Sequence, residues 1–252
     1  MSRAHLRILS IGLLLVSANA LRAADDDPKA IIARGVKAHG GVEKITKYQA
    51  ARSTNKGKLK IPGVGEVEFT QEVSYMLPDK LKDTLSFSVA GQAVSVVTLV
   101  NGDTIAIEAN GNAVDGGDAV KESIKAMRYM VKVAKLASLV QDKGYEFSLV
   151  GEVKVEDKPA VGIRVVSKGQ KDINLFFSKE TGLLVKIEHR TMKPGGGGEV
   201  TEERIIQSYE KGTDGLPVPK KVLIKHDGET FAEAEVIEFN FLEKIDASEF
   251  KK

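Results

Sequence analysis

Histidines come first among the residues that could do chemistry, because a metal site or a general base in this sequence would have to use them. The chain holds four, each far from the others in sequence: His5, His39, His189 and His226. No pair has the HExxH or HxxEH spacing that places two imidazoles around one zinc ion. We therefore predict no metal site, and we expect the histidines beyond the N-terminal segment to lie in turns or on strand surfaces.

Carboxylates and glycines supply the remaining chemical possibilities. A pair of acids suits glycosidase chemistry only across a cleft, so we expect Asp25–Asp27 to form a helix N-terminus and Glu202-Glu203 to lie on a solvated strand face. The sequence has neither the GxSxG turn of a serine hydrolase nor a GxxxxGK[ST] phosphate loop. The glycines of residues 194–198 (PGGGG) are typical of a flexible hairpin loop. These observations predict a protein that is not an enzyme and that has no cofactor.

Composition and charge exclude further classes of protein. The absence of cysteine excludes disulfides, thiolate nucleophiles, iron–sulfur clusters, cysteine-ligated zinc and a lipid-modified N-terminal cysteine. The 252 residues carry 37 Lys and Arg and 35 Asp and Glu, and two of the bases, Arg3 and Arg7, fall in the first 20 residues, which hold no acid. From residue 21 onward the chain is therefore neutral, with 35 charges of each sign. A balanced chain lacks the positive field that nucleic-acid binding requires.

The N-terminal segment has the three parts of a secretory signal. The two arginines are followed by the apolar run Ile8–Val16 and then by the small residues Ala18 and Ala20. We predict a signal peptide over residues 1–20, with cleavage after Ala20 or as late as residue 24. The apolar run is too short for a membrane span, which needs about 20 residues. The sequence therefore predicts a protein that is soluble in the periplasm after cleavage.

Helical spacing marks two regions that flank or interrupt the strands. Asp27 and Pro28 are typical of the N-cap and first position of a helix, which His39-Gly40-Gly41 should end. A shorter helix is expected over residues 42–48. A long amphipathic helix is predicted over residues 119–140, with apolar residues at three- and four-residue steps: Ile124, Met127, Val131, Ala134 and Leu139.

Period-two alternation predicts strands over most of the remaining chain. One hairpin is expected across Asn101-Gly102 and a loop over residues 110–117. The second half should hold seven strands, over residues 145–155, 160–167, 172–177, 183–190, 200–209, 220–226 and 229–241. No βαβ repeat is present, which argues against a doubly wound nucleotide-binding fold. The fold class predicted is α+β, mainly β: a half-open antiparallel barrel, or curved sheet, covered by the N-terminal helix and the long central helix.

Apolar strand faces provide the one positive functional signal. If the two helices fill the concave side of the sheet, these faces form an ordinary core; if they cover it loosely, an apolar cleft remains that can take acyl chains. Met127 and Met130 can likewise line a ligand groove or fill a core. The candidate cavity-lining residues are Val94, Val96, Ile105, Ile107, Met127, Met130, Val131, Ile163, Val165, Ile173, Leu175, Phe177, Leu183, Val185, Ile237 and Phe239.

Three motifs resemble those of a known family. They are Ala38-His39-Gly40-Gly41, the stretch Gly151–Val161 (GEVKVEDKPAV) in the style G-x-x-x-V-D-G-K-P-A-Y, and Leu175–Leu184 (LFFSKETGLL) in the style L-Y-F-D-x-E-T-G-L-L. Together they resemble the outer-membrane lipoprotein-sorting superfamily of LolA and LolB. The chain departs from the pattern at Glu156-Asp157, where Asp-Gly is usual, and at Ser178, where aspartate is common.

The resemblance implies a single LolA-like domain over residues 25–252, a half-open barrel whose cavity holds lipoprotein acyl chains. It also implies a basic residue near the cavity that tunes acyl release, for which no motif here identifies a counterpart. The function expected is that of an exported, non-catalytic, monomeric carrier that sorts envelope lipoproteins and touches the membrane transiently. The alternative is an envelope interaction or sensor module with a protein partner and no transport role. The superfamily includes envelope-stress regulators and domains of secreted zinc proteases, so the fold alone does not decide between these functions.

Overall fold

A computed structural model describes residues 27–193 and 198–251. The predicted signal peptide, with Asp25 and Asp26, lies outside the described residues, as do residues 194–197 of the predicted glycine-rich loop. Within the described ranges, no helix combines the length and the apolar character needed to cross a membrane.

The helices begin where the sequence indicates. Helix α2 (Pro28–Ala38) starts at Asp27, whose side chain accepts a hydrogen bond of 3.1 Å from the backbone N–H of Lys29. Helix α3 (Gly41–Lys47) follows directly. The start of α2 obeys the capping rules from which it was predicted, and α3 begins and ends one residue before the predicted range of residues 42–48.

The helical region predicted over residues 119–140 spans residues 117–141 and is broken near its end. It consists of α4 (Gly117–Ala134) and α5 (Ala137–Gln141), separated at Leu136, which adopts a left-handed conformation with φ of 61°. The Leu136 side chain is completely buried in the core, and Ser138 Oγ donates to the carbonyl oxygen of Lys132 across the break. Burial of the Leu136 side chain compensates for this unfavourable backbone conformation. The break was not predicted, because no proline or glycine marks the position in the sequence.

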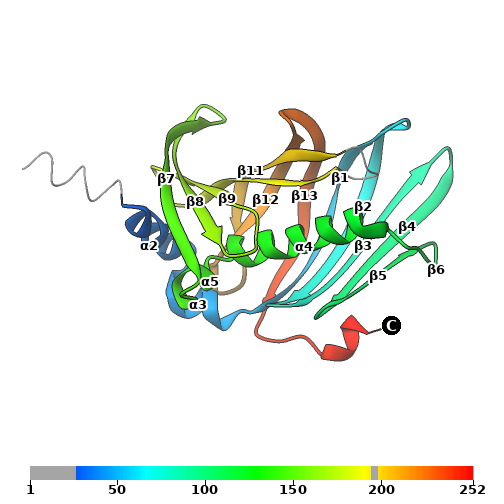
Figure 1. Cartoon of the computed structure of the whole chain (residues 1–252), viewed down its shortest axis with the longest axis horizontal. Coiled ribbons are helices and arrows are strands. Elements are labelled where there is room, and N and C mark those ends of the chain that lie inside the picture. The colour runs from blue at the N-terminus through cyan, green and yellow to red at the C-terminus, as the bar shows by residue number, and fades with distance from the viewer. Residues whose placement is uncertain (1–26, 194–197, 252) are drawn as a thin grey trace, which may run out of the picture.

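Thirteen antiparallel strands form a single curved sheet that is not closed (Figure 1). Its order is β6-β5-β4-β3-β2-β1-β13-β12-β11-β10-β9-β8-β7, so each half of the chain forms a meander, and the two meanders meet where β1 pairs with β13. The predicted class, a mainly β half-open antiparallel barrel, is confirmed. The strands are β1 (Ala50–Ile61), β2 (Gly65–Met76), β3 (Lys80–Val89), β4 (Gln92–Asn101), β5 (Thr104–Ala109), β6 (Asn112–Ala113), β7 (Tyr145–Val155), β8 (Lys158–Ser167), β9 (Ile173–Ser178), β10 (Leu184–Met192), β11 (Glu199–Lys211), β12 (Pro217–His226) and β13 (Glu229–Leu242).

Two local predictions in the first meander need correction. The β4–β5 turn is Gly102-Asp103, one residue later than predicted, because Asn101 pairs with Thr104 and Gly102 takes the positive φ. The predicted loop over residues 110–117 contains the two-residue strand β6 at the sheet edge.

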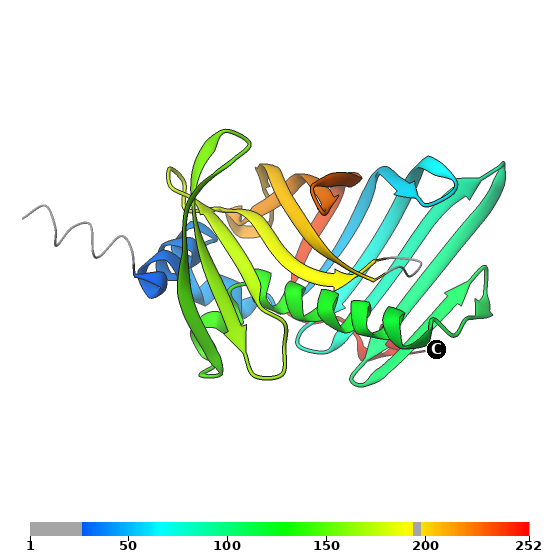
Figure 2. The ribbon, with the colours of Figure 1, turned by 45° about the horizontal axis from the view of Figure 1, so that its top comes forward.

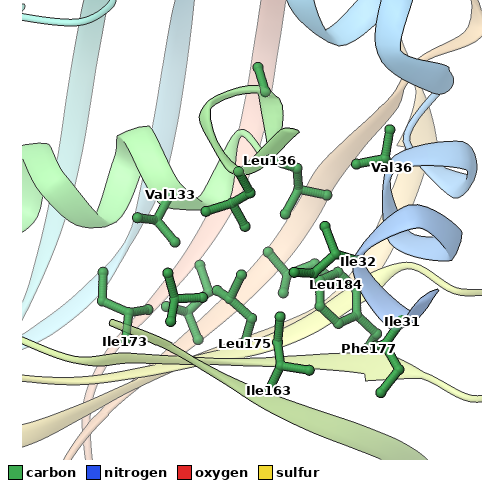
Figure 3. Packing of buried hydrophobic residues seen from close by; sticks show 14 of the residues in the cluster. Ile31, Ile32, Val36, Val133, Leu136, Ile163, Ile173, Leu175, Phe177 and Leu184 are labelled. Atoms are coloured by element: carbon green, nitrogen blue, oxygen red, sulfur yellow. The ribbon is translucent and has the colours of Figure 1, made fainter. Parts of the chain in front are cut away.

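Helix α4 crosses the strands on the concave face of the sheet, and α2, α3 and α5 gather at one end (Figures 1 and 2). The largest core cluster forms at that end, where Val133 and Leu136 face Ile163, Ile173 and Leu175 (Figure 3). Helix α2 closes the cluster from the other side with Ile31, Ile32 and Val36.

Two bulges turn side chains away from their predicted faces. The β9–β10 register shifts between Leu184 and Lys186, so Leu184 and Ile187 enter the main core. Val185 packs instead with Phe176 and Ile205 in a separate cluster. On β13, Glu238 and Val236 pair with the consecutive β1 residues Thr54 and Asn55. Ile237 between them is therefore the extra residue of the bulge, and it is 44% exposed. A bulge adds one residue to one strand and so reverses the alternation that a sequence pattern assumes.

The β1–β13 pairing generates a first prediction, at Gly57. A methyl group added to Gly57 would overlap the backbone carbonyl oxygen of Glu233 on β13, and neither backbone can move without disturbing the ladder. We expect Gly57→Ala to lower the free energy of unfolding by about 1–3 kcal/mol, as measured by urea denaturation. Gly144→Ala is the matched control, because Gly144 is exposed and an added methyl group there meets no atom within 4 Å. Equal stability of the two variants would contradict the close approach of β1 and β13.

Candidate ligand-binding site

A pocket of about 340 Å³ lies between α4 and the concave face of the sheet. Its walls come from the C-terminal half of α4, from Lys44 and Ile45 of α3, and from strands on both sides of the β1–β13 pairing. The volume is at the lower end of the range of about 300–1,000 Å³ typical of small-molecule sites. Its main apolar lining residues are Val73, Leu81, Met127, Met130, Val131, Val236, Phe239 and Phe241.

The structure divides the candidate cavity-lining residues into three groups. Those that line the pocket are Met127, Met130, Val131 and Phe239. Those that are packed in the closed core beside α2 and α5 are Ile163, Val165, Ile173, Leu175 and Phe177. The rest lie elsewhere. Ile105 and Ile107 pack with Val100 and Ile124. Val94, Val96 and Leu183 are partly buried, and Val185 and Ile237 are the two residues displaced by the bulges. The concave side is thus filled in the core beside α2 and α5 and hollow beneath the C-terminal half of α4.

Three basic side chains line the pocket, although no motif singled them out: Lys44, whose Nζ donates to the carbonyl oxygen of Asp214 at 2.7 Å, Lys135 and Arg204. Lys135 follows the last residue of α4, and its ammonium lies 4.4 Å from the ring centre of Phe241 and 5.8 Å from that of Tyr75. Burial lowers the pKa of Lys135 to about 8. Arg204 reaches the lining from β11, with its Nε donating to Glu202 Oε1 at 2.7 Å. A helix break places Lys135, and a pair of residues two positions apart on β11 places Arg204; neither has a sequence signature.

A polar row crosses the pocket floor on three neighbouring strands. Asn55 Nδ2 on β1 donates to Gln71 Oε1 on β2 at 3.2 Å, and Gln71 Nε2 donates to both carboxylate oxygens of Asp83 on β3 at 3.0 Å. Burial raises the pKa of Asp83 to about 6, against the opposing effects of the Gln71 hydrogen bond and the Arg204 charge. Asp83 lies on the same face of β3 as Leu81 and Leu85. An acidic residue at an apolar position of this alternation was therefore the one sign of the row in the sequence.

A second polar cluster lies on the concave side of β10, β11 and β12. His189, Glu202 and His226 are directly paired across these strands, with one imidazole Nε2 at 3.2 Å and the other at 3.1 Å from the two Glu202 oxygens. All three side chains are buried, which corrects the expectation of surface histidines and of a solvated Glu202. Burial would raise the pKa of Glu202, but Arg204 and the two histidine hydrogen bonds hold it far below its usual range.

The side chains of this cluster all point at the Glu202 carboxylate, and not at a common position between them where a metal ion could bind. Both histidines direct Nε2 at Glu202, and Arg204 occupies one of the same oxygens. Within residues 27–193 and 198–251 no group of three or more His, Cys, Asp or Glu side chains could hold a metal ion. The geometry suits a hydrogen-bonded tie between three strands.

The buried carboxylate of Asp83 generates a pH prediction. Its folded-state pKa of about 6 lies above the ordinary 3.8, so ionisation of Asp83 disfavours the folded state as the pH rises from about 4 to 7. That pKa difference corresponds to about 3 kcal/mol. Because Asn does not ionise, the free energy of unfolding of Asp83→Asn minus that of the wild type should be larger at pH 7 than at pH 4, by up to this amount. Urea denaturation at a series of pH values measures it, and a constant difference between the two proteins would contradict the burial of the charge.

Comparisons with known proteins identify the fold. The sequence has no significant match to a protein-family model or to a curated protein. A solved LolA superfamily protein from Nitrosomonas europaea superposes with a TM-score of 0.55 at 8% identity, covering 89% of this chain and 97% of that one. An outer membrane lipoprotein-sorting protein domain from Vibrio parahaemolyticus gives a TM-score of 0.49 at 10% identity, over 87% and 97% of the two chains. The lipoprotein LppX from Mycobacterium tuberculosis gives 0.33 at 14% identity, over 87% and 100%. The resemblance carried by the turn motifs is therefore confirmed at the level of architecture, and this chain has the LolA superfamily fold.

Proposed function

We propose that this protein is an exported, non-catalytic carrier that binds lipid or lipoprotein acyl chains and sorts lipoproteins in the cell envelope. The observation that supports the proposal is the pocket beneath α4, whose lining is mainly apolar. The predicted signal peptide supports a periplasmic location. The carrier would act as a monomer through the single domain of residues 25–252 and would touch the membrane only while it exchanges cargo.

The pocket suits a ligand that is held and then released. Burying about eight methylenes gains about 6 kcal/mol at about 0.8 kcal/mol each. Association itself costs at least about 4 kcal/mol in lost translational and rotational freedom. The small surplus shields an acyl chain from water and still allows the chain to pass to an acceptor.

Lys135 is the candidate for the basic residue that tunes release. It lies against the aromatic rings of the lining, whereas Arg204 is engaged by Glu202. Among the described residues Lys135 has ring contacts and no ion pair, so its charge is available to a polar group of the ligand in the pocket.

Filling the pocket tests the proposal. Ala134 on α4 lines the pocket, and Ala134→Phe would occupy part of its volume. We expect this variant to bind a fluorescent diacyl lipopeptide at least about tenfold more weakly than the wild type, a loss of about 1.4 kcal/mol. Fluorescence titration of delipidated protein measures the effect. Ala119→Phe, at an exposed position on the same helix, should bind like the wild type.

Native mass spectrometry of wild-type protein purified from a periplasm gives an independent readout. A carrier should retain lipid at a stoichiometry of about one. A lipid-free protein that fails to bind the lipopeptide and instead copurifies with an envelope protein would favour the interaction module over the carrier.

A further inference from the structure

The polar row on the pocket floor is unusual in a lining that is otherwise mainly apolar. Asn55, Gln71 and Asp83 lie beside Val73 and Leu81, under the same helix. Burying a polar group without a partner costs about 1–3 kcal/mol, and burying a charge costs more. A set of apolar side chains would serve a plain hydrocarbon ligand better, so the row points to something in the ligand other than its chain.

Most of the hydrogen-bond donors of the row are already used. The amide nitrogen of Gln71 contacts both Asp83 oxygens at 3.0 Å, and that of Asn55 contacts Gln71 Oε1 at 3.2 Å and Ser53 Oγ at 3.5 Å. A side-chain amide has two N–H groups; Asn55 uses both, and Gln71 directs one between the two Asp83 oxygens.

The acceptors of the row are not exhausted. A carboxylate offers about four lone-pair sites, and Gln71 is the sole hydrogen-bond donor to Asp83 among the residues that the structure describes. The unfilled sites belong to a side chain that lines the pocket. The row therefore presents hydrogen-bond acceptors, and a negative charge, to whatever enters.

Charge around the pocket limits the kind of donor that fits. Lys44, Lys135 and Arg204 also line the pocket, but an anionic group that sat directly against Asp83, the one acid in the described lining, would be repelled by it and would leave its lone pairs without a donor. A cationic headgroup would meet Arg204, whose charge acts on Asp83, and would pass Lys135. A neutral donor satisfies the carboxylate without opposing either cation.

We propose that the pocket selects acyl lipids with a neutral hydrogen-bond-donating polar end, a hydroxyl or an amide N–H, and that Asp83 is the residue that accepts from it. This selectivity rests on the proposed carrier function and adds the chemical class of the ligand. The chain lies against Phe239, Phe241 and α4, and the donor lies over Asp83.

Three probes with the same acyl chain separate the contributions of donor and charge. Monolaurin carries neutral hydroxyl donors, methyl laurate carries only acceptors, and laurate carries a negative charge. Competition with a fluorescent lipid at about pH 7.5, below the critical micelle concentrations, gives the three affinities for the wild-type protein. We expect monolaurin to bind about tenfold more tightly than methyl laurate, because a hydrogen bond to a charged acceptor gives at least that factor, and we expect laurate to bind most weakly.

Variants of Asp83 assign the selectivity to this residue. Asp83→Leu should bind monolaurin and methyl laurate within about a factor of two of each other, because the acceptor is gone. Asp83→Asn should bind laurate more tightly than the wild type, since the repelling charge is gone. Glu72→Gln is the matched control, because Glu72 follows Gln71 on β2 and is exposed; it should keep the wild-type order. Circular dichroism melting verifies folding, and if Asp83→Leu does not fold, Asp83→Asn and the wild-type series still decide.

The outcomes separate the inference from the function on which it rests. If all three probes bind the wild type with equal affinity, the carrier function survives and the selectivity is overturned. If Asp83→Leu keeps the full preference for monolaurin, another residue is the acceptor and the assignment of Asp83 fails. If no probe binds at micromolar concentrations, the carrier proposal fails and the selectivity fails with it.

Discussion

The structure depends on covering one face of a single-layer sheet. A curved sheet with an apolar concave face must bury that face against another element, and here the covers are α4 along its length and the α2–α3–α5 group at one end. Where α2 and α5 join α4, the cover is complete and Ile163, Leu175 and Phe177 are fully buried. Beneath the C-terminal half of α4, where α3 shares the cover, the concave face is not completely filled, and the pocket is the space that remains.

The break at Leu136 makes this division of the concave face possible. Leu136 and the α5 residues Ala137 and Leu139 turn into the core, while Lys135, one position earlier, stays beside the pocket. In a straight helix Lys135 and Leu136 would point about 100° apart around one axis; the break turns the axis itself, so that α5 runs into the core. One left-handed residue therefore separates the packed end of the sheet from the hollow part.

Much of the architecture is accessible from local pattern, because turns and alternation are local properties. The start of α2 at Asp27-Pro28 and the bounds of β7 follow from capping and from period-two alternation. The bulges beside Val185 and Ile237 were not predictable, because a bulge is defined by the partner strand. For the same reason the sequence separation of His189 and His226 concealed their convergence on Glu202, which only the register of three strands produces. Within the candidate site, the methionines of α4 and Phe239 were accessible from apolar spacing. Of the polar row, only Asp83 had a signal, as an acid within the apolar alternation of β3; its contacts with Gln71 and Asn55 were not accessible, because the three residues come from three strands.

The pairing of β1 with β13 also has a consequence for how the molecule can be made. These are the first and last strands of the sheet along the chain, and their ladder is the sole junction between the two meanders in the described sheet. Contacts between strands so distant in sequence close the longest loop in the fold and form slowly. Until β13 has been synthesised, β1 is a twelve-residue edge with unpaired backbone groups, and such an edge is open to aggregation. A chain truncated before Glu229 would keep both meanders and lose the seam that makes them one sheet.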